Sequence, residues 1–220
     1  MLIPNSHGQV VVAINMSSAN KDNELVAISK KNYGRIVLGS KKLPAQQSHL
    51  LSHFPSLATI ADGTPRAKAF VDAHNALRTL HGAPPVVWDN ALAEGAGSYA
   101  AACVKGHATL PNDIGENLYY SASSAKISID PALAKTAVDD WYEEEPDWDY
   151  ATSAPKGTGI TGHFTQVVWK STAKIGCGIS SCPNIKIGGK TWPDLVYVVC
   201  RYTPSGNWDG QYAASVPKKK

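Results

Sequence analysis

The sequence lacks the features that mark several large classes of protein. No window is long and apolar enough to span a bilayer, and no basic segment followed by an uninterrupted hydrophobic core opens the chain. It therefore shows neither a transmembrane segment nor a secretory signal. It has no HExxH helix and no GxSxG elbow, the usual sequence marks of zinc peptidases and serine hydrolases. Internal repeats are also absent.

Charged residues make up only 18% of the 220 residues, and their signs are unevenly distributed. Residues 1–63 and Lys218–Lys220 each carry a net charge of +3, whereas residues 64–217 carry −3. An acidic body lacks the coherent basic face that phosphate binding needs, so we expect no nucleic-acid partner. With 43% hydrophobic residues, the chain can build one well-buried core and an extension.

Only four cysteines are present, at positions 103, 177, 182 and 200. Four residues separate Cys177 from Cys182, but no CxxC or histidine pair follows at the spacing of a structural zinc site, which favours disulfides. Four cysteines allow three pairings, which the sequence alone does not separate. Disulfides indicate an oxidising compartment. The sequence also has one glycosylation sequon, Asn15-Met16-Ser17, which by itself is weak evidence for secretion.

The chain divides into an N-terminal extension (1–62), a main domain (63–212) and a basic tail (213–220) that we expect to be solvated. The extension has three strand-like runs, able to form a small hairpin, before a linker-like stretch rich in Pro, Ser, His and Gln. These runs are Gln9–Ile14, Leu25–Ser29 and Arg35–Leu38.

Three helices and two strands are predicted in the main domain. Each helix begins at a polar residue able to cap it, two of them followed by proline: Thr64-Pro65, Asp89 and Asp130-Pro131. Each helix has a stripe of residues at helical spacing that we expect to face inward. In the first helix the stripe is Phe70, His74 or Ala73, Leu77 and Leu80; in the second it is Leu92, Ala96, Tyr99, Ala100 and Cys103; in the third it is Leu133, Ala137, Trp141 and Glu144. The strands are Lys174–Ser180 and Leu195–Tyr202. Helices before and between strands predict an α+β fold, a three-layer α-β-α sandwich.

One set of polar residues is out of place among apolar neighbours. His163 lies in the apolar, aromatic run Gly162–Trp169, and Glu144 ends an inward-facing helical stripe. Burying either group is costly unless a partner compensates it. His107 and Glu116 can join them in a candidate site, held together by a proton, an imidazolium or a metal ion. The alternative is a hydrogen-bonded polar cluster that holds a loop and responds to pH.

This set, together with the run Tyr197–Trp208, resembles the cysteine-rich secretory, antigen 5 and pathogenesis-related 1 proteins, the CAP superfamily. The resemblance extends from Thr64 to Tyr212 and indicates a fungal or plant-type pathogenesis-related 1 protein. It implies the CAP form of the α-β-α sandwich and a secreted protein with a role in defence or virulence. It also implies the disulfides Cys103–Cys182 and Cys177–Cys200.

The resemblance further implies that His107, Glu116, Glu144 and His163 meet in a solvent-open cavity. There His107 and His163 can bind a divalent cation, and two imidazoles with carboxylate and water suit Zn²⁺ or another divalent metal. A metal-bound water makes a protease-like hydrolase one alternative function. We expect no enzyme, because no catalytic motif joins these residues.

Members of this family bind lipids, so the resemblance implies extracellular lipid binding or export, with a sterol or fatty acid as ligand. The sterol loop corresponds to Trp148–Thr158, with Trp148, Tyr150, Pro155, Lys156 and Gly157 as its candidate residues. Relatives often close this loop with Pro-Gly-aromatic, whereas this chain has Pro155-Lys156-Gly157. The missing ring removes apolar contact worth about 1.5–3 kcal/mol, which argues against sterol binding.

Two further modes of binding are open. A fatty acid can lie between helices if their small residues leave room: Ala93, Gly95, Gly97, Ala101 and Ala134. A protein partner at the cavity rim is the other mode. We expect Trp192 to be an exposed contact residue, and Trp88 and Trp208 to be structural.

Overall fold

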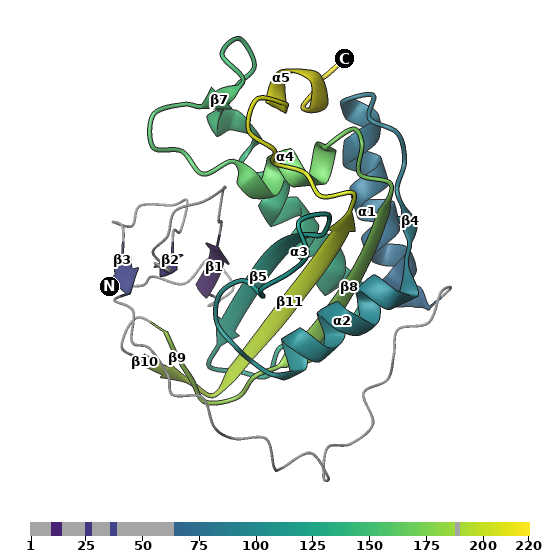
Figure 1. The fold of residues 1–220 in the computed structure, drawn as a ribbon. Coiled ribbons are helices and arrows are strands. Elements are labelled where there is room, and N and C mark those ends of the chain that lie inside the picture. The colour runs from purple at the N-terminus through teal and green to yellow at the C-terminus, as the bar shows by residue number, and fades with distance from the viewer. Residues whose placement is uncertain (1–9, 15–24, 28–35, 39–63, 188–189) are drawn as a thin grey trace.

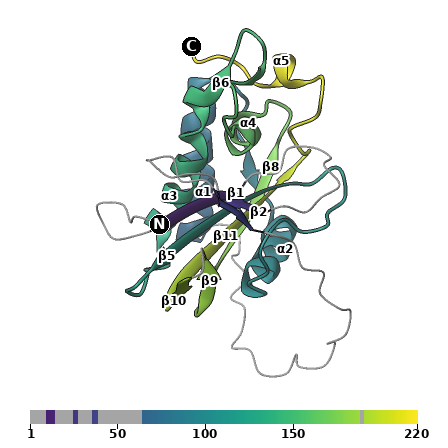
Figure 2. The same ribbon diagram turned by 90° about the vertical axis from the view of Figure 1, so that its left-hand side faces the viewer.

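The computed structural model describes residues 10–14, 25–27, 36–38, 64–187 and 190–220. A five-stranded sheet of strand order β1-β5-β11-β8-β4 forms its centre. Figures 1 and 2 show helix α2 on one face of this sheet and helices α1 and α3 on the other. The predicted α+β fold, a three-layer α-β-α sandwich, is confirmed.

The three long helices begin where the sequence predicts. They are α1 (Pro65–Leu80), α2 (Asn90–Ala101) and α3 (Pro131–Tyr142). Thr64 Oγ1 accepts a hydrogen bond from the Ala67 amide at 3.2 Å. The carboxylates of Asp89 and Asp130 each accept from two amides of the first turn that follows them. Each side chain thus pairs backbone donors that the helix leaves without a partner.

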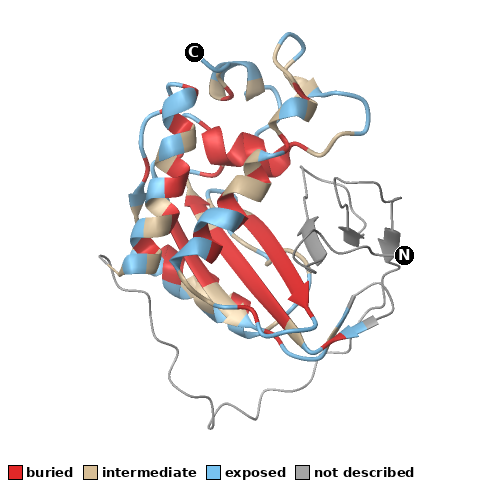
Figure 3. Ribbon diagram, turned by 180° about the vertical axis from the view of Figure 1, so that it is seen from behind, coloured by how far each residue is buried: buried red, intermediate tan, exposed pale blue. Residues whose placement is uncertain are grey.

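The predicted strands of the main domain are confirmed as β8 (Lys174–Ser181) and β11 (Asp194–Thr203). Strand β5 (Gly115–Ser123) was not predicted; it pairs antiparallel with β11 and places Glu116 opposite Arg201. Strand β4 (Val87–Trp88), a short edge strand parallel to β8, was not predicted either. Figure 3 shows that the central strands are buried along most of their length.

Three predicted strands before the main domain are present: β1 (Val10–Ile14), β2 (Leu25–Ala27) and β3 (Ile36–Leu38). β2 and β3 form an antiparallel hairpin, while β1 pairs antiparallel with β5 and so joins the central sheet. The glycosylation candidate Asn15 and the linker-like stretch 41–63 lie outside the described residues.

Short elements complete the fold at the two ends of the sandwich. They are η1 (Glu145–Asp147), β6 (Trp148–Asp149), β7 (Ala154–Pro155), α4 (Gly162–Val168), β9 (Ile185–Ile187), β10 (Lys190–Trp192) and α5 (Tyr212–Ser215). No helix in the described part of the chain is both long and apolar enough to cross a membrane.

The core consists of two clusters of buried apolar residues. Residues of the first include Phe70, Trp141, Phe164, Trp169 and Tyr202, and those of the second include Leu118, Tyr120, Trp192, Leu195 and Tyr197. Burial of this much apolar area is the main stabilising contribution to the fold.

Two local expectations were wrong. Trp192 is buried, at 4% exposure, because β10 leads into β11 and its ring packs in the second cluster. Leu80 is 48% exposed at the last turn of α1. The three lysines of the basic tail are exposed, as expected, although Val216 is buried and the Lys220 amide donates to the Leu80 carbonyl at 3.0 Å. Trp208 is 42% exposed, and its Nε1 donates to Ser205.

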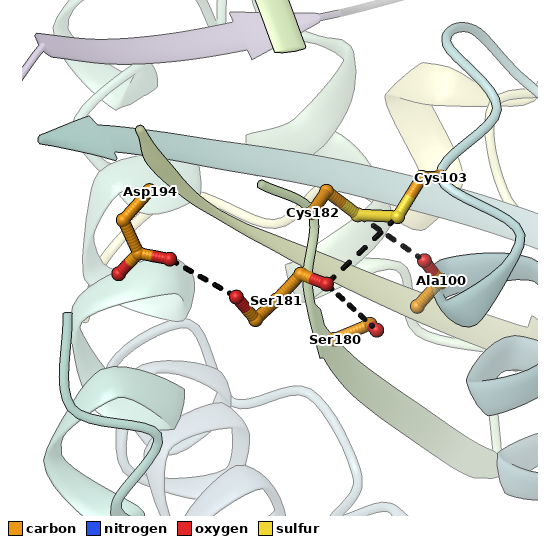
Figure 4. Close-up of a disulfide and its surroundings, with 6 residues drawn as sticks. All are labelled: Ala100, Cys103, Ser180, Ser181, Cys182 and Asp194. Atoms are coloured by element: carbon orange, nitrogen blue, oxygen red, sulfur yellow. Dashed lines mark hydrogen bonds between the residues drawn. A yellow bond between two sulfur atoms is a disulfide. The ribbon is translucent and has the colours of Figure 1, made fainter. Parts of the chain in front are cut away.

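Two disulfides cross-link the sheet, one to the segment after α2 and one between two of its strands. Cys103–Cys182 links the chain just after α2 to the end of β8, with its Cα atoms 5.7 Å apart, as Figure 4 shows. Cys177–Cys200 links the paired strands β8 and β11. These are the pairs that the family resemblance implies. The second helix ends at Ala101, however, so Cys103 lies beyond it, in the left-handed region at φ 54°.

Candidate functional site

Glu144 and His163 form one buried pair between α3 and α4. Glu144 lies two residues after the end of α3 and is 2% exposed. Its Oε1 lies 2.7 Å from His163 Nδ1, and its Oε2 accepts from the His163 and Phe164 amides at 2.9 and 3.1 Å. Those amides belong to the first turn of α4 and have no partner within that short helix. The carboxylate therefore fixes α4 to the end of α3.

His107 and Glu116 form a second pair beside the sheet. Glu116 Oε1 lies 3.1 Å from His107 Nδ1 and accepts from the Ala108 amide at 3.0 Å. Its Oε2 is 3.2 Å from Arg201 Nε, on the facing strand β11. The carboxylate side chain is 3% exposed and the Arg201 side chain 13%. Glu116 therefore fixes the segment after α2 to β5 and β11.

A buried amide connects the two pairs. Asn117, next to Glu116 on β5, donates from its side chain to the His163 carbonyl at 3.2 Å. Each carboxylate of the predicted tetrad already accepts three hydrogen bonds from protein donors. Most of the acceptor positions of each carboxylate are therefore already occupied by the protein itself.

Whether a divalent cation fits this site depends on the Nε2 atoms of the two histidines, because each Nδ1 already faces a carboxylate. His107 Nε2 is buried and has no hydrogen-bond partner in the described part of the chain, while its Nδ1 faces a carboxylate. This is the usual arrangement of a zinc-bound histidine. Among the described residues, however, no group of three or more His, Cys, Asp and Glu side chains is placed to hold a metal ion. A third protein ligand, which both structural and catalytic zinc sites use, is therefore missing there.

The aromatic residues of the predicted sterol loop face inward. Trp148 is 2% exposed and packs 5.5 Å from the Tyr212 ring. Tyr150 lies 6.5 Å from the Phe164 ring, and its hydroxyl donates to Glu145 at 2.9 Å. Lys156 Nζ donates to the Pro146 carbonyl at 2.8 Å. The exposed residues of the loop are Ala151, Thr152, Pro155, Lys156, Gly157 and Thr158. The exposed part therefore presents no aromatic ring.

The small residues of α2 pack closely against the sheet. A Cβ atom on Gly178 would lie 2.2 Å from Gly97 Cα, and one on Gly176 would lie 2.2 Å from the Ala93 amide nitrogen. On Gly95, a Cβ atom would lie 2.4 Å from the Arg201 guanidinium. These contacts are tighter than van der Waals contact allows, so the small side chains permit helix–sheet approach. Ala134 of α3 is fully buried in the first core cluster.

Two charged residues of structural importance were assigned no role from the sequence. Arg201 interrupts an apolar strand, a pattern that could have identified it as a partner for a buried acid. Arg78 is 1% exposed and donates to the carbonyls of Pro84, Val167, Trp169 and Thr172 at 2.7–2.9 Å. Burial lowers its pKa to about 10. Nothing in the spacing of α1 distinguishes Arg78 from a surface arginine.

The fold agrees with comparisons to known proteins. The sequence model of the cysteine-rich secretory protein family, CAP, matches residues 71–202. The chain belongs to this family.

Named relatives of this CAP protein come from vertebrates and from a fungus. It is 38% identical over 143 residues to the fruiting body protein SC7 of Schizophyllum commune, covering 63% of this chain and 64% of that protein. It is 33% identical over 170 residues to the mouse peptidase inhibitor R3HDML, with 68% and 63% coverage. The human peptidase inhibitor 15 is also 33% identical, over 168 residues, with 68% and 62% coverage. The chain thus matches a little under two thirds of the length of these curated relatives, which do not single out the fungal or plant subgroup.

Solved structures share the fold at low sequence identity. A crystal structure of NaASP2 with Zn²⁺ has a TM-score of 0.53 at 23% identity, covering 74% of this chain and 89% of that one. The structure of Na-ASP-1 has a TM-score of 0.53 at 19% identity, with 84% and 47% coverage. These similarities support the sandwich architecture.

Proposed function

We propose that this CAP protein is a secreted, non-catalytic binding protein whose partner is an extracellular peptidase. The observation that carries the proposal is the state of the two carboxylates. Glu116 and Glu144 each accept three hydrogen bonds from the protein itself, which fixes the loops around them and leaves each carboxylate few free acceptor positions for a substrate. Rigid loops on a disulfide-bonded scaffold suit stoichiometric recognition of another protein, because little ordering entropy is lost on binding.

The class of partner follows from the relatives. Two of the proteins compared above are called peptidase inhibitors, and the match to each covers 68% of this chain. The two disulfides agree with an extracellular location. Inhibition by binding also requires no catalytic group on the inhibitor.

Trp208 is the residue from which we would begin to map the contact surface. Its ring is 42% exposed, and its Nε1 donates to the Ser205 carbonyl and hydroxyl at 3.2 and 3.0 Å. The neighbouring Asn207 bonds Thr165 and the Gly162 carbonyl of α4. A fixed, exposed tryptophan is a typical anchor of a protein interface.

The test is a panel of extracellular serine, cysteine, aspartic and metallopeptidases incubated with the purified protein. We expect activity of at least one class to fall in proportion to added protein, with a stable complex on size exclusion. Trp208→Ala should weaken inhibition by about tenfold or more. Val87→Ala, a matched change at a residue 58% exposed on β4, should not. Failure to inhibit any class would refute the proposed partner.

The same preparation distinguishes the two other functions implied by the family resemblance. Saturable uptake of a sterol or fatty acid without peptidase inhibition would favour the lipid function instead. That outcome requires apolar space that the buried Trp148 ring and the closely packed α2 do not offer in this conformation. Turnover of a peptide or ester by the protein alone, lost in His163→Ala, would identify a hydrolase, with His107 and His163 as its metal ligands.

A further inference from the structure

The C-terminal residues 215–220, which we call the strap, lie across the end of the sandwich. The Ser215 carbonyl accepts from the Lys170 amide at 3.0 Å, and the Lys220 amide donates to the Leu80 carbonyl at 3.0 Å. Figures 1 and 2 show the C-terminus beside the end of α1, on the same side as the β6–β7 loop. The strap is therefore held at both of its ends.

His81 connects the middle of the strap to two helices. It caps the C-terminus of α1 and is 1% exposed. Its Nδ1 lies 2.6 Å from the Pro217 carbonyl oxygen, and its Nε2 lies 2.8 Å from the Tyr142 hydroxyl at the end of α3. A carbonyl can only accept, so Nδ1 carries the proton and Nε2 of the neutral ring accepts from Tyr142. Both bonds fit one tautomer of the neutral imidazole.

The groups around His81 have opposing effects on its charge. Burial is the largest influence and lowers its pKa, while the Pro217 bond and Glu145 of η1 raise it and Lys219 of the strap lowers it. Uncharged rings surround the imidazole: Tyr142 of α3 at 5.7 Å, Tyr150 after β6 at 6.4 Å and Phe164 of α4 at 5.6 Å. The neutral ring is therefore the form that this structure stabilises.

Protonation of His81 would disturb its environment in two ways. Nε2–H would point at the hydroxyl proton of Tyr142, so that hydroxyl would have to turn and accept instead. Tyr142 already interacts with Lys219, whose Nζ lies 5.1 Å from the ring centre and 3.5 Å from Glu145. The new imidazolium would then share this small volume with an ammonium group. Like charges repel each other, and the burial of His81 weakens the screening of this repulsion, although the Lys219 side chain itself is 45% exposed.

We propose that His81 is a pH-sensitive latch: its neutral ring holds the strap against α1 and α3, and its protonation releases the strap while the sandwich stays folded. Release would remove the Lys219 side chain from Tyr142 and the Pro217 carbonyl from His81 Nδ1. The acid-sensitive surface is thus the end of the sandwich that carries the β6–β7 loop.

Hydrogen exchange measured by mass spectrometry on the full chain tests the latch. Protection of the peptide covering 212–220, corrected for the chemical exchange rate, is compared between about pH 7.5 and about pH 4.5, on either side of the ordinary histidine range. We expect protection to fall by about tenfold or more in acid, with peptides from β11 unchanged. Loss of protection in both peptides together would mean acid unfolding and would overturn the proposal, as would unchanged protection in the strap.

Two variants separate the latch from a merely structural role. His81→Gln keeps a donor and an acceptor but cannot gain charge, so its strap should stay protected at both pH values. Lys219→Met keeps the alkyl contact with Tyr142 and removes the cation, which should move the midpoint of release upward by about 0.5–1 pH unit. A midpoint that does not move, or that moves downward, would refute the proposed charge balance even if the His81 variant fails to fold.

Discussion

Replacing Glu144 by alanine should destabilise the protein much more than an average surface change. The substitution removes the acceptor for His163 Nδ1 and for the His163 and Phe164 amides, all of them buried. The imidazole can change tautomer, but the two amides cannot change and would each lose a partner at about 1–3 kcal/mol. We therefore expect a loss of about 3–5 kcal/mol in the free energy of unfolding. In a domain of this size, that lowers Tm by about 6–20 °C.

Glu144→Gln refines this prediction, because glutamine keeps the shape of the side chain. Its carbonyl oxygen can accept from both α4 amides, while its amide group donates to His163 Nδ1 if the ring proton moves to Nε2. The expected loss is about 1–2 kcal/mol.

Urea unfolding followed by circular dichroism measures both Glu144 variants. Glu94→Ala, at an exposed acid of α2, is the matched control and should stay within about 0.5 kcal/mol of the parent. A loss below about 1 kcal/mol in Glu144→Ala would refute the idea that this carboxylate holds α4 in place. Equal losses in the alanine and glutamine variants would show that charge, and not the hydrogen-bond pattern, is what matters.

Three further changes test other parts of the structure. Burial raises the pKa of Asp140 to about 7, and its Oδ2 has no hydrogen-bond partner in the described part of the chain. The native state therefore loses stability as pH rises from about 4 to about 7. In urea unfolding at a series of pH values, Asp140→Asn should have a free energy of unfolding up to about 4 kcal/mol above that of the parent at pH values above 7. Near pH 4 the two proteins should differ by almost nothing. Arg78→Met should leave four carbonyls without their donor and cost about 3–5 kcal/mol in the same assay, whereas a cost near zero would mean that water replaces the guanidinium. Replacing Cys103 and Cys182 by serine opens a link between residues 79 positions apart and should cost about 4 kcal/mol, seen as a lower Tm by calorimetry; an unchanged Tm would contradict this.

Much of the fold could be predicted from local sequence patterns. Thr64, Asp89 and Asp130 each combine a capping side chain with an apolar helical stripe, and in the structure each caps its helix. The strand β5 was missed because it is buried on both faces and has no alternation of polar and apolar residues. Trp192 was placed on the surface because a turn-rich hairpin is usually exposed, whereas its burial depends on packing between distant segments.

The residues of the candidate site could be predicted from the sequence, but most of their contacts with one another and with other elements could not. Glu144 and His163 attracted attention as polar groups in apolar runs, and in the structure they contact each other. The contribution of Arg201 depends on the register between β5 and β11, which no local pattern specifies. The role of His81 depends on a contact 136 residues away in sequence, with Pro217. Such contacts follow from the tertiary fold and were beyond the reach of motif analysis.

The most direct test of the account is a titration of the most strongly inhibited peptidase with the parent protein and with His107→Gln. Glutamine can still donate to Glu116, so the loop after α2 should keep its position, while the imidazole is lost. We predict that both proteins inhibit to the same end point at a fixed molar ratio and remain uncleaved in the complex. Peptide turnover by the parent protein alone, abolished in His107→Gln, would contradict it and would make the paired histidines a catalytic centre.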